Sequence, residues 1–229
     1  VAVPAVLIGL SSELSKRASV TMNRPVFIDF VRQFRYTLRV TRVRTAFVMS
    51  ILMELCVFST SAMMPVMARD LLGVGAGALG VLTAAGSLGA ILFGIVMTSW
   101  GELRRKGLVT MLACTLCGLA LISYALSHWF LLSVAIAVVL GVAMMVYDVM
   151  IFTLAQVTVP SARRNQSLGL FVQTFGLNPI GSTLTGAVAQ VAGMPIALLA
   201  AGGIVVFYSL VCLVPKRHVW DRLRVSNSD

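Results

Sequence analysis

The chain has 229 residues, of which 59% are hydrophobic and 11% charged, and its formal net charge is +10. A soluble domain carries roughly 25% charged residues, so this composition excludes an ordinary water-soluble globular protein. The mean hydropathy of +0.95 indicates a chain that resides in a bilayer, which long apolar runs can cross as helices. The basic residues lie between these runs, which favours membrane orientation over nucleic-acid binding.

The segment before the first long apolar run is strongly basic. Residues 1–10 are apolar but too short to cross a bilayer, and we interpret them as the end of a preceding transmembrane helix. Residues 11–44 then form a cytoplasmic linker. Asn23 and Pro25 predict a helix start in it, and this amphipathic helix is expected to bind an anionic inner leaflet. A solvated linker is the alternative. The basic face of the helix holds Arg32, Arg35, Arg39 and Arg42.

Six apolar runs follow, each long enough to cross a membrane. A helix of about 21 residues rises about 31 Å, which matches a hydrocarbon core of roughly 30 Å. The sequence therefore predicts an all-α membrane protein, with a six-transmembrane-helix bundle over residues 45–215 and a cytoplasmic tail over 216–229. The runs are 45–67, 74–99, 107–127, 129–156, 167–191 and 195–215.

Basic residues occur on every second connection between these runs. The second connection contains Arg104, Arg105 and Lys106, and the fourth contains Arg163 and Arg164, whereas the fifth contains no charged residue. Basic connections stay on the cytoplasmic side of a membrane. The pattern therefore predicts an even number of spans with both ends of the bundle in the cytoplasm.

The second run opens with a glycine motif, Gly75-x-Gly77-x-x-Gly80. The spacing of its glycines matches the dinucleotide-binding fingerprint. That motif requires a preceding strand, however, and here a predicted membrane span precedes it. We interpret its glycines as sites where helices approach closely. Small residues recur further along the run at four-residue spacing, which is typical of tight contacts between membrane helices. These residues are Gly86, Ala90 and Gly94.

The four cysteines all lie inside apolar runs, which favours packing in the core over a disulfide framework. Cys114 and Cys117 have the spacing of redox and zinc motifs, but no His or carboxylate lies in the same run to complete a ligand set. We therefore predict neither a metal site nor a cofactor. The cysteines are Cys56, Cys114, Cys117 and Cys212.

An intramembrane protease is a class that six spans would suit. Such an enzyme needs a nucleophile and a base at membrane depth. The histidines of the chain are His128, in a short loop, and His218, in the tail. We therefore predict that the protein is not an enzyme.

Four strongly polar side chains share one depth band near the middle of the predicted bundle. Glu54 lies roughly 14 Å, and Asp148 roughly 12 Å, from the cytoplasmic end of its run. Gln173 and Asn178 enter the fifth run from the same side, roughly 9–17 Å deep. Ionisable groups at this depth are costly and usually face a cavity or a partner. We predict that these residues bind a solute or a proton; the alternative is that neutral carboxyls only hydrogen-bond between helices.

Polar residues are unevenly distributed among the runs. Runs 107–127 and 195–215 contain no charged or amide side chain, so we expect them at the lipid-facing periphery. In the first run, Ser50, Glu54 and Ser61 predict a polar stripe along one face. The fifth run contains helix-breaking residues, which predict a bend that lines a cavity. These residues are Gly176, Pro179, Gly181 and Gly186.

Four stretches of the chain are distinctive when taken together. They are the basic linker, the glycine-rich run that ends in "GELRRKG", the stretch "LGVAMMVYDVMIFTLAQVTVPSARRNQSLG", and "FGLNPIGSTLTGAVA". In this order they resemble the central loop and the eighth, tenth and eleventh helices of a major facilitator superfamily transporter. The similarity is greatest to the bacterial enterobactin-exporter and macrolide-efflux-like branch, and it covers nearly the whole chain.

This resemblance implies the C-terminal half of a twelve-helix major facilitator fold, with a missing N-terminal half as its partner. It also implies secondary active transport across the bacterial cytoplasmic (inner) membrane, by proton-coupled efflux of small amphipathic molecules such as drugs or siderophores. Such carriers work by alternating access. The alternative is a non-transporting assembly or sensor subunit built from a half-bundle. The cytoplasmic gating loop implied by the resemblance contains Glu102, Arg104, Arg105 and Lys106.

Overall fold

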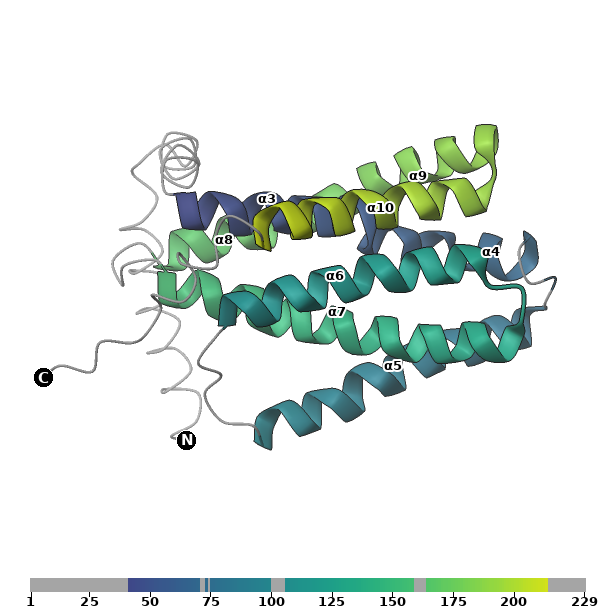
Figure 1. Cartoon of the computed structure of the whole chain (residues 1–229), viewed down its shortest axis with the longest axis horizontal. Helices are drawn as coiled ribbons and strands as arrows, with labels where there is room; N and C mark the ends of the chain where they lie inside the picture. The colour runs from purple at the N-terminus through teal and green to yellow at the C-terminus, as the bar shows by residue number, and fades with distance from the viewer. Residues whose placement is uncertain (1–40, 71–72, 74, 100–105, 159–163, 214–229) are drawn as a thin grey trace, which may run out of the picture. The chain divides into compact units, whose positions relative to one another are not determined.

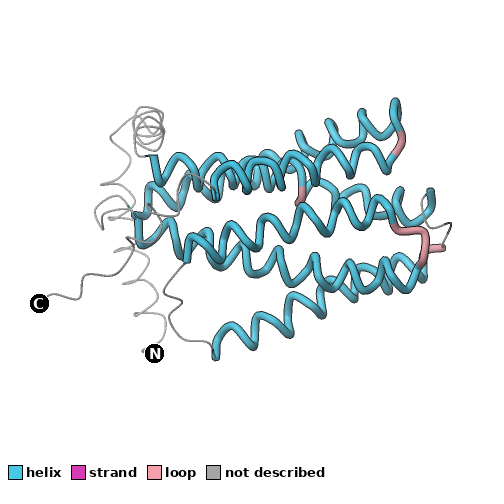
Figure 2. Tube along the Cα trace, viewed as in Figure 1, coloured by secondary structure: helices cyan, strands magenta, loops and turns pink. Residues whose placement is uncertain are grey.

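Most of the chain after residue 40 is described by the computed structural model. Every regular element in this part is a helix, which confirms the predicted all-α fold (Figure 2). The predictions for residues 1–10, the linker helix up to residue 40, the tail, and the loop residues Glu102, Arg104 and Arg105 lie outside the described residues. The described residues are 41–70, 73, 75–99, 106–158 and 164–213.

The helices run back and forth along the bundle (Figure 1). Short 3-10 helices, η1 and η3, interrupt two of the predicted membrane-spanning runs. In chain order the elements are α3 (Thr41–Cys56), η1 (Phe58–Met63), α4 (Met64–Asp70), α5 (Ala76–Ser99), α6 (Lys106–Leu126), α7 (Phe130–Thr158), α8 (Arg164–Thr174), η3 (Phe175–Leu177), α9 (Asn178–Ala192) and α10 (Met194–Leu213).

The first helical path is broken in its middle, a feature that the sequence reasoning missed. The α3, η1 and α4 segments together provide the apolar stretch Val43–Arg69. Ser59, Thr60 and Ser61 each donate a hydrogen bond to a backbone carbonyl three or four residues earlier, at 2.5–2.6 Å. Such bonds compete with the helical ladder and bend it. Pro65 follows in α4 and has no N–H to continue the ladder.

The predicted run 167–191 is also broken, as its glycines and proline led us to expect. Pro179 lies in the first turn of α9, where its missing N–H is harmless, but it cannot bond back into α8. With 11 residues in α8 and 15 in α9, neither helix is long enough to span a bilayer alone. The other five predicted runs each coincide with a segment that is long and apolar enough to cross a membrane.

Glycines bring the long helices into close contact. A Cβ atom on Gly118 of α6 would lie 2.8 Å from the carbonyl oxygen of Gly202 on α10. The α5 and α7 helices meet where Gly141 faces the backbone of Gly86, which leaves no room for a side chain. Small residues allow such approaches between membrane helices. The close packing predicted for Gly86 is confirmed.

Two packing predictions are wrong. A Cβ atom on Gly75, Gly77 or Gly80 would meet no heavy atom within 4 Å in the described structure, so this motif does not bring helices together there. The run 107–127, expected at the periphery, forms α6, whose apolar window is 56% buried compared with 17% for α5. The reason is that α6 packs against both α7 and α10 (Figure 1), whereas α5 packs mainly on α7.

Candidate functional site

Glu54 lies in the last turn of α3, and its side chain is only 3% exposed. The preceding residue, Met53, faces α6, where its Sδ atom lies 3.6 Å from the Sγ atom of Cys114. Successive helical residues point about 100° apart. Anchoring α3 through Met53 therefore directs Glu54 away from α6.

The side chains of Glu54, Asp148 and Asn178 lie near one another in the bundle. The Glu54 carboxyl interacts with the side-chain amide of Asn178 and, electrostatically, with the Asp148 carboxyl. The three residues come from α3, α7 and α9, and the last two are half-buried. We call this set the polar cluster. Three of the four side chains that we expected at one depth are thus brought together.

Gly181 explains how Asn178 reaches Glu54. A Cβ atom at Gly181 would lie 2.6 Å from the carbonyl oxygen of Leu55 and 2.8 Å from the Cβ atom of Ser59. The α9 helix therefore lies directly on the backbone at the end of α3. Asn178 is one turn before Gly181, and Glu54 precedes Leu55. The contact therefore brings the side-chain amide of Asn178 close to the Glu54 carboxyl.

A hydrogen bond between α3 and α8 lies next to the cluster. The Ser50 and Thr174 hydroxyl oxygens are 2.8 Å apart and buried, and Thr174 also donates to the carbonyl of Phe171 at 2.7 Å. The ring of Phe171 packs edge-on against Phe47, with centroids 5.7 Å apart. The end of α8 that leads into the break is therefore held against α3. Sequence reasoning missed Thr174, although it adjoins Gln173.

Tyr147 is a second residue that sequence reasoning missed. Its side chain is 2% exposed, and its hydroxyl has no partner at hydrogen-bonding geometry in the described part of the chain. Ser50, Glu54 and Asp148 nevertheless lie near this hydroxyl. A buried hydroxyl without a well-formed hydrogen bond is unfavourable. Its position next to Asp148 in the sequence could have indicated that Tyr147 lies near the site.

Two of the remaining predicted residues have exposed side chains. Gln173 is exposed on α8. Ser61 is exposed and donates to the carbonyl of Phe58, so the expected polar stripe ends at the η1 break, where the side-chain direction changes. Lys106 begins α6 and is half-buried.

The CysxxCys pair packs in the core, as predicted. Cys114 and Cys117 are 2% and 0% exposed, and both are free thiols. Among the described residues, no group of three or more His, Cys, Asp or Glu side chains is placed to hold a metal ion.

The cluster has a specific chemical capacity. In the described structure, neither of its two carboxyls interacts with a cationic side chain. Two nearby carboxylates in apolar surroundings repel each other and lack hydration, so both cannot carry charge at low cost. A proton or the cationic group of a ligand would relieve this cost. The arrangement is therefore suited to binding one or the other.

A family model described as a transmembrane secretion effector, within the major facilitator superfamily, matches residues 4–229. The chain belongs to this family. The match confirms the superfamily resemblance and makes the chain a multi-pass membrane protein of a transporter family, in agreement with its apolar helices. No curated protein matches the chain.

Proposed function

We propose that the protein is a secondary active transporter that exports small amphipathic molecules in exchange for protons. The observation that carries this proposal is the proximity of Glu54, Asp148 and Asn178, from three helices, in a bundle of a transporter family. Because no cationic side chain of the described residues interacts with the two carboxyls, a proton and a cationic substrate can compete to neutralise them. Such competition is what exchange transport requires.

The helix breaks support a mechanism of alternating access. The η1 and η3 breaks interrupt the two paths that supply Glu54 and Asn178, and α9 packs against η1. Discontinuous helices commonly line transport sites, because a break supplies both a place to bend and unpaired backbone groups. We therefore propose that these two paths move relative to the rest of the bundle as the site opens to either side.

The orientation and the assembly belong to the same proposal. Basic residues such as Arg44 and Lys106 lie at the N-terminal ends of α3 and α6, which favours a cytoplasmic location for that end of the bundle. We propose that the chain acts as the C-terminal half of a twelve-helix carrier in a bacterial inner membrane, together with an N-terminal half. The proposed substrate class includes drugs and siderophores.

The test uses the full-length protein in cells and in proteoliposomes. Ethidium, a fluorescent amphipathic cation, serves as the transported probe, and a pH-sensitive dye inside the vesicles reports proton movement. We expect Glu54→Gln and Asp148→Asn each to lower coupled transport by about tenfold or more, since each removes an ionisable group of the cluster. Asp70→Asn makes the same chemical change at the end of α4, beyond the apolar segment Val43–Arg69, and should leave transport unchanged.

Two results would count against this function. Export that survives both substitutions would remove the proposed role of the carboxyls. A folded wild-type protein that moves neither ethidium nor protons would favour the non-transporting assembly or sensor subunit instead.

A further inference from the structure

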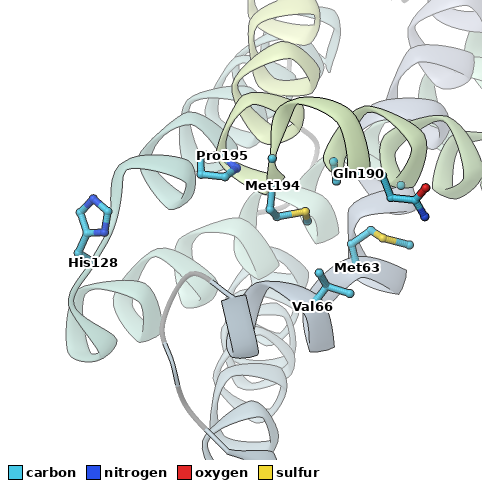
Figure 3. A pocket seen from close by; sticks show the side chains of 9 residues that line it. Met63, Val66, His128, Gln190, Met194 and Pro195 are labelled. Atoms are coloured by element: carbon cyan, nitrogen blue, oxygen red, sulfur yellow. The ribbon is translucent and has the colours of Figure 1, made fainter.

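A cavity of about 760 Å³ lies at the end of the bundle that holds the α6–α7 connection (Figure 3). Its walls come from η1, α4, α9, the start of α10 and the α6–α7 connection. Figure 3 shows Met63, Val66, Gln190 and Met194 around it, with His128 farther away on its loop. The cavity has the size of a pocket for a drug-sized molecule, which is typically about 300–1,000 Å³.

Local chain geometry explains why this space exists. A single residue, Gly193, joins α9 to α10, and its φ of +89° is one that side chains rarely allow. The tight reversal keeps the ends of α9 and α10 together, while α9 packs on η1 and α10 packs along α6. Gly186 adds room, because a Cβ atom there would stand 3.7 Å from the methyl group of Met63.

The lining is apolar and almost uncharged. None of the described residues that line the cavity is Asp, Glu, Lys or Arg. Met63 and Met194 present flexible thioethers, which adapt to ligands of different shapes and pack well against aromatic rings. The Gln190 side chain supplies an amide that can both donate and accept hydrogen bonds.

From this geometry we infer that the cavity is a second ligand site, which binds uncharged amphipathic organic molecules of drug size. The apolar body of the ligand packs between Met63 and Met194, and a carbonyl or amide group of the ligand hydrogen-bonds to Gln190. A permanently charged ligand is disfavoured, because none of the described lining residues is a carboxylate that could offset the loss of its hydration.

This site is separate from the polar cluster. Met63 follows Glu54 by nine residues of the first helical path, or about 14 Å. Gln190 follows Asn178 by twelve residues of α9, or about 18 Å. The cluster and the cavity also favour opposite ligands, cationic and neutral respectively. Binding at the cavity does not require that the protein transports anything, so failure of either proposal leaves the other open.

Photolabelling of the full-length protein in lipid nanodiscs tests the inference. The probe is a neutral aromatic amide that carries an alkyl diazirine. We expect saturable labelling that maps by mass spectrometry to the segments around Met63 and Met194. The unlabelled amide should compete for the site, and its quaternary-ammonium counterpart should compete at least about tenfold less well.

Two variants locate the binding. Gly186→Leu fills the cavity and should lower labelling about tenfold, whereas Gly203→Leu is its control, since a Cβ atom at Gly203 meets no heavy atom within 4 Å and the residue does not line the cavity. Gln190→Leu removes only the amide of an exposed residue, so it tests the site without disturbing the core. It should weaken binding about twofold to tenfold.

Several outcomes would overturn the inference. Labelling that does not saturate would show partition into lipid only. Labelling that maps elsewhere, or that persists in Gly186→Leu and Gln190→Leu, would exclude this cavity. Labelling that only added phospholipid displaces would assign the cavity to a lipid tail.

Discussion

Gly181→Ala tests whether close contact between α9 and α3 builds the polar cluster. The new Cβ atom would lie 2.6 Å from the carbonyl oxygen of Leu55 and 2.8 Å from its Cα atom. Carbon atoms pack at about 3.5–4.0 Å, so α9 must move away from α3 by roughly 1 Å. Both groups that clash are backbone or close to it, so a side-chain rotation cannot relieve the contact.

The cost of this movement follows from its size. Overpacking a close contact destabilises a protein by about 1–3 kcal/mol. For a chain of this length that corresponds to a fall in melting temperature of about 2–12 °C. The same movement carries Asn178 away from Glu54, so ethidium transport should fall as well.

The assay is thermal unfolding of the purified protein together with transport in proteoliposomes. Gly169→Ala is the matched control, because a Cβ atom at Gly169 of α8 meets no heavy atom within 4 Å. It should change neither property. If Gly181→Ala keeps the wild-type melting temperature and transport rate, the helix contact does not position the amide, and our account of the cluster is wrong.

Two further predictions concern groups around the site and in the bundle. Tyr147→Phe removes a buried hydroxyl that makes no hydrogen bond of normal geometry within the described structure, so stability should stay the same or rise by up to about 1 kcal/mol, while transport should slow. A loss of stability in thermal melts would instead indicate an ordinary structural hydrogen bond. Gly141→Ala places a Cβ atom on the backbone of Gly86 and should separate α5 from α7, with a fall in melting temperature of at least about 2 °C. Gly80→Ala, where a Cβ atom meets open space, should not change the melt, and equal effects of the two would refute the packing described for α5.

The number and location of the apolar segments could be predicted from the sequence, because hydropathy over about 20 residues reflects the solvent around a helix. Five predicted runs coincide with helical segments that can cross a membrane. The break in the fifth run could also be predicted, since Pro179 acts on its own helix whatever surrounds it. The break at Ser59, Thr60 and Ser61 left a comparable local signal, a run of hydroxyl side chains, that was not recognised.

Helical spacing and depth were enough to nominate Glu54, Asp148 and Asn178, because each lies at a similar distance along its own helix. They could not decide between Asn178 and Gln173, since both enter from the same side. The structure separates them: the contact of Gly181 with Leu55 brings Asn178 to the carboxyls, while Gln173 remains exposed on α8.

The sequence patterns could not predict which helices pack against each other. Gly80 and Gly86 look alike in the sequence, yet in the described part of the chain only Gly86 meets another helix. The apolar run 107–127 looked peripheral, but α6 is the most buried of the described membrane-length helices, because α7 and α10 both pack against it. In a bilayer, apolar side chains are equally stable facing lipid or protein, so hydropathy shows that a helix is in the membrane but not which neighbours it has. Only the tertiary structure decides which faces meet, and with them where the polar cluster and the second cavity form.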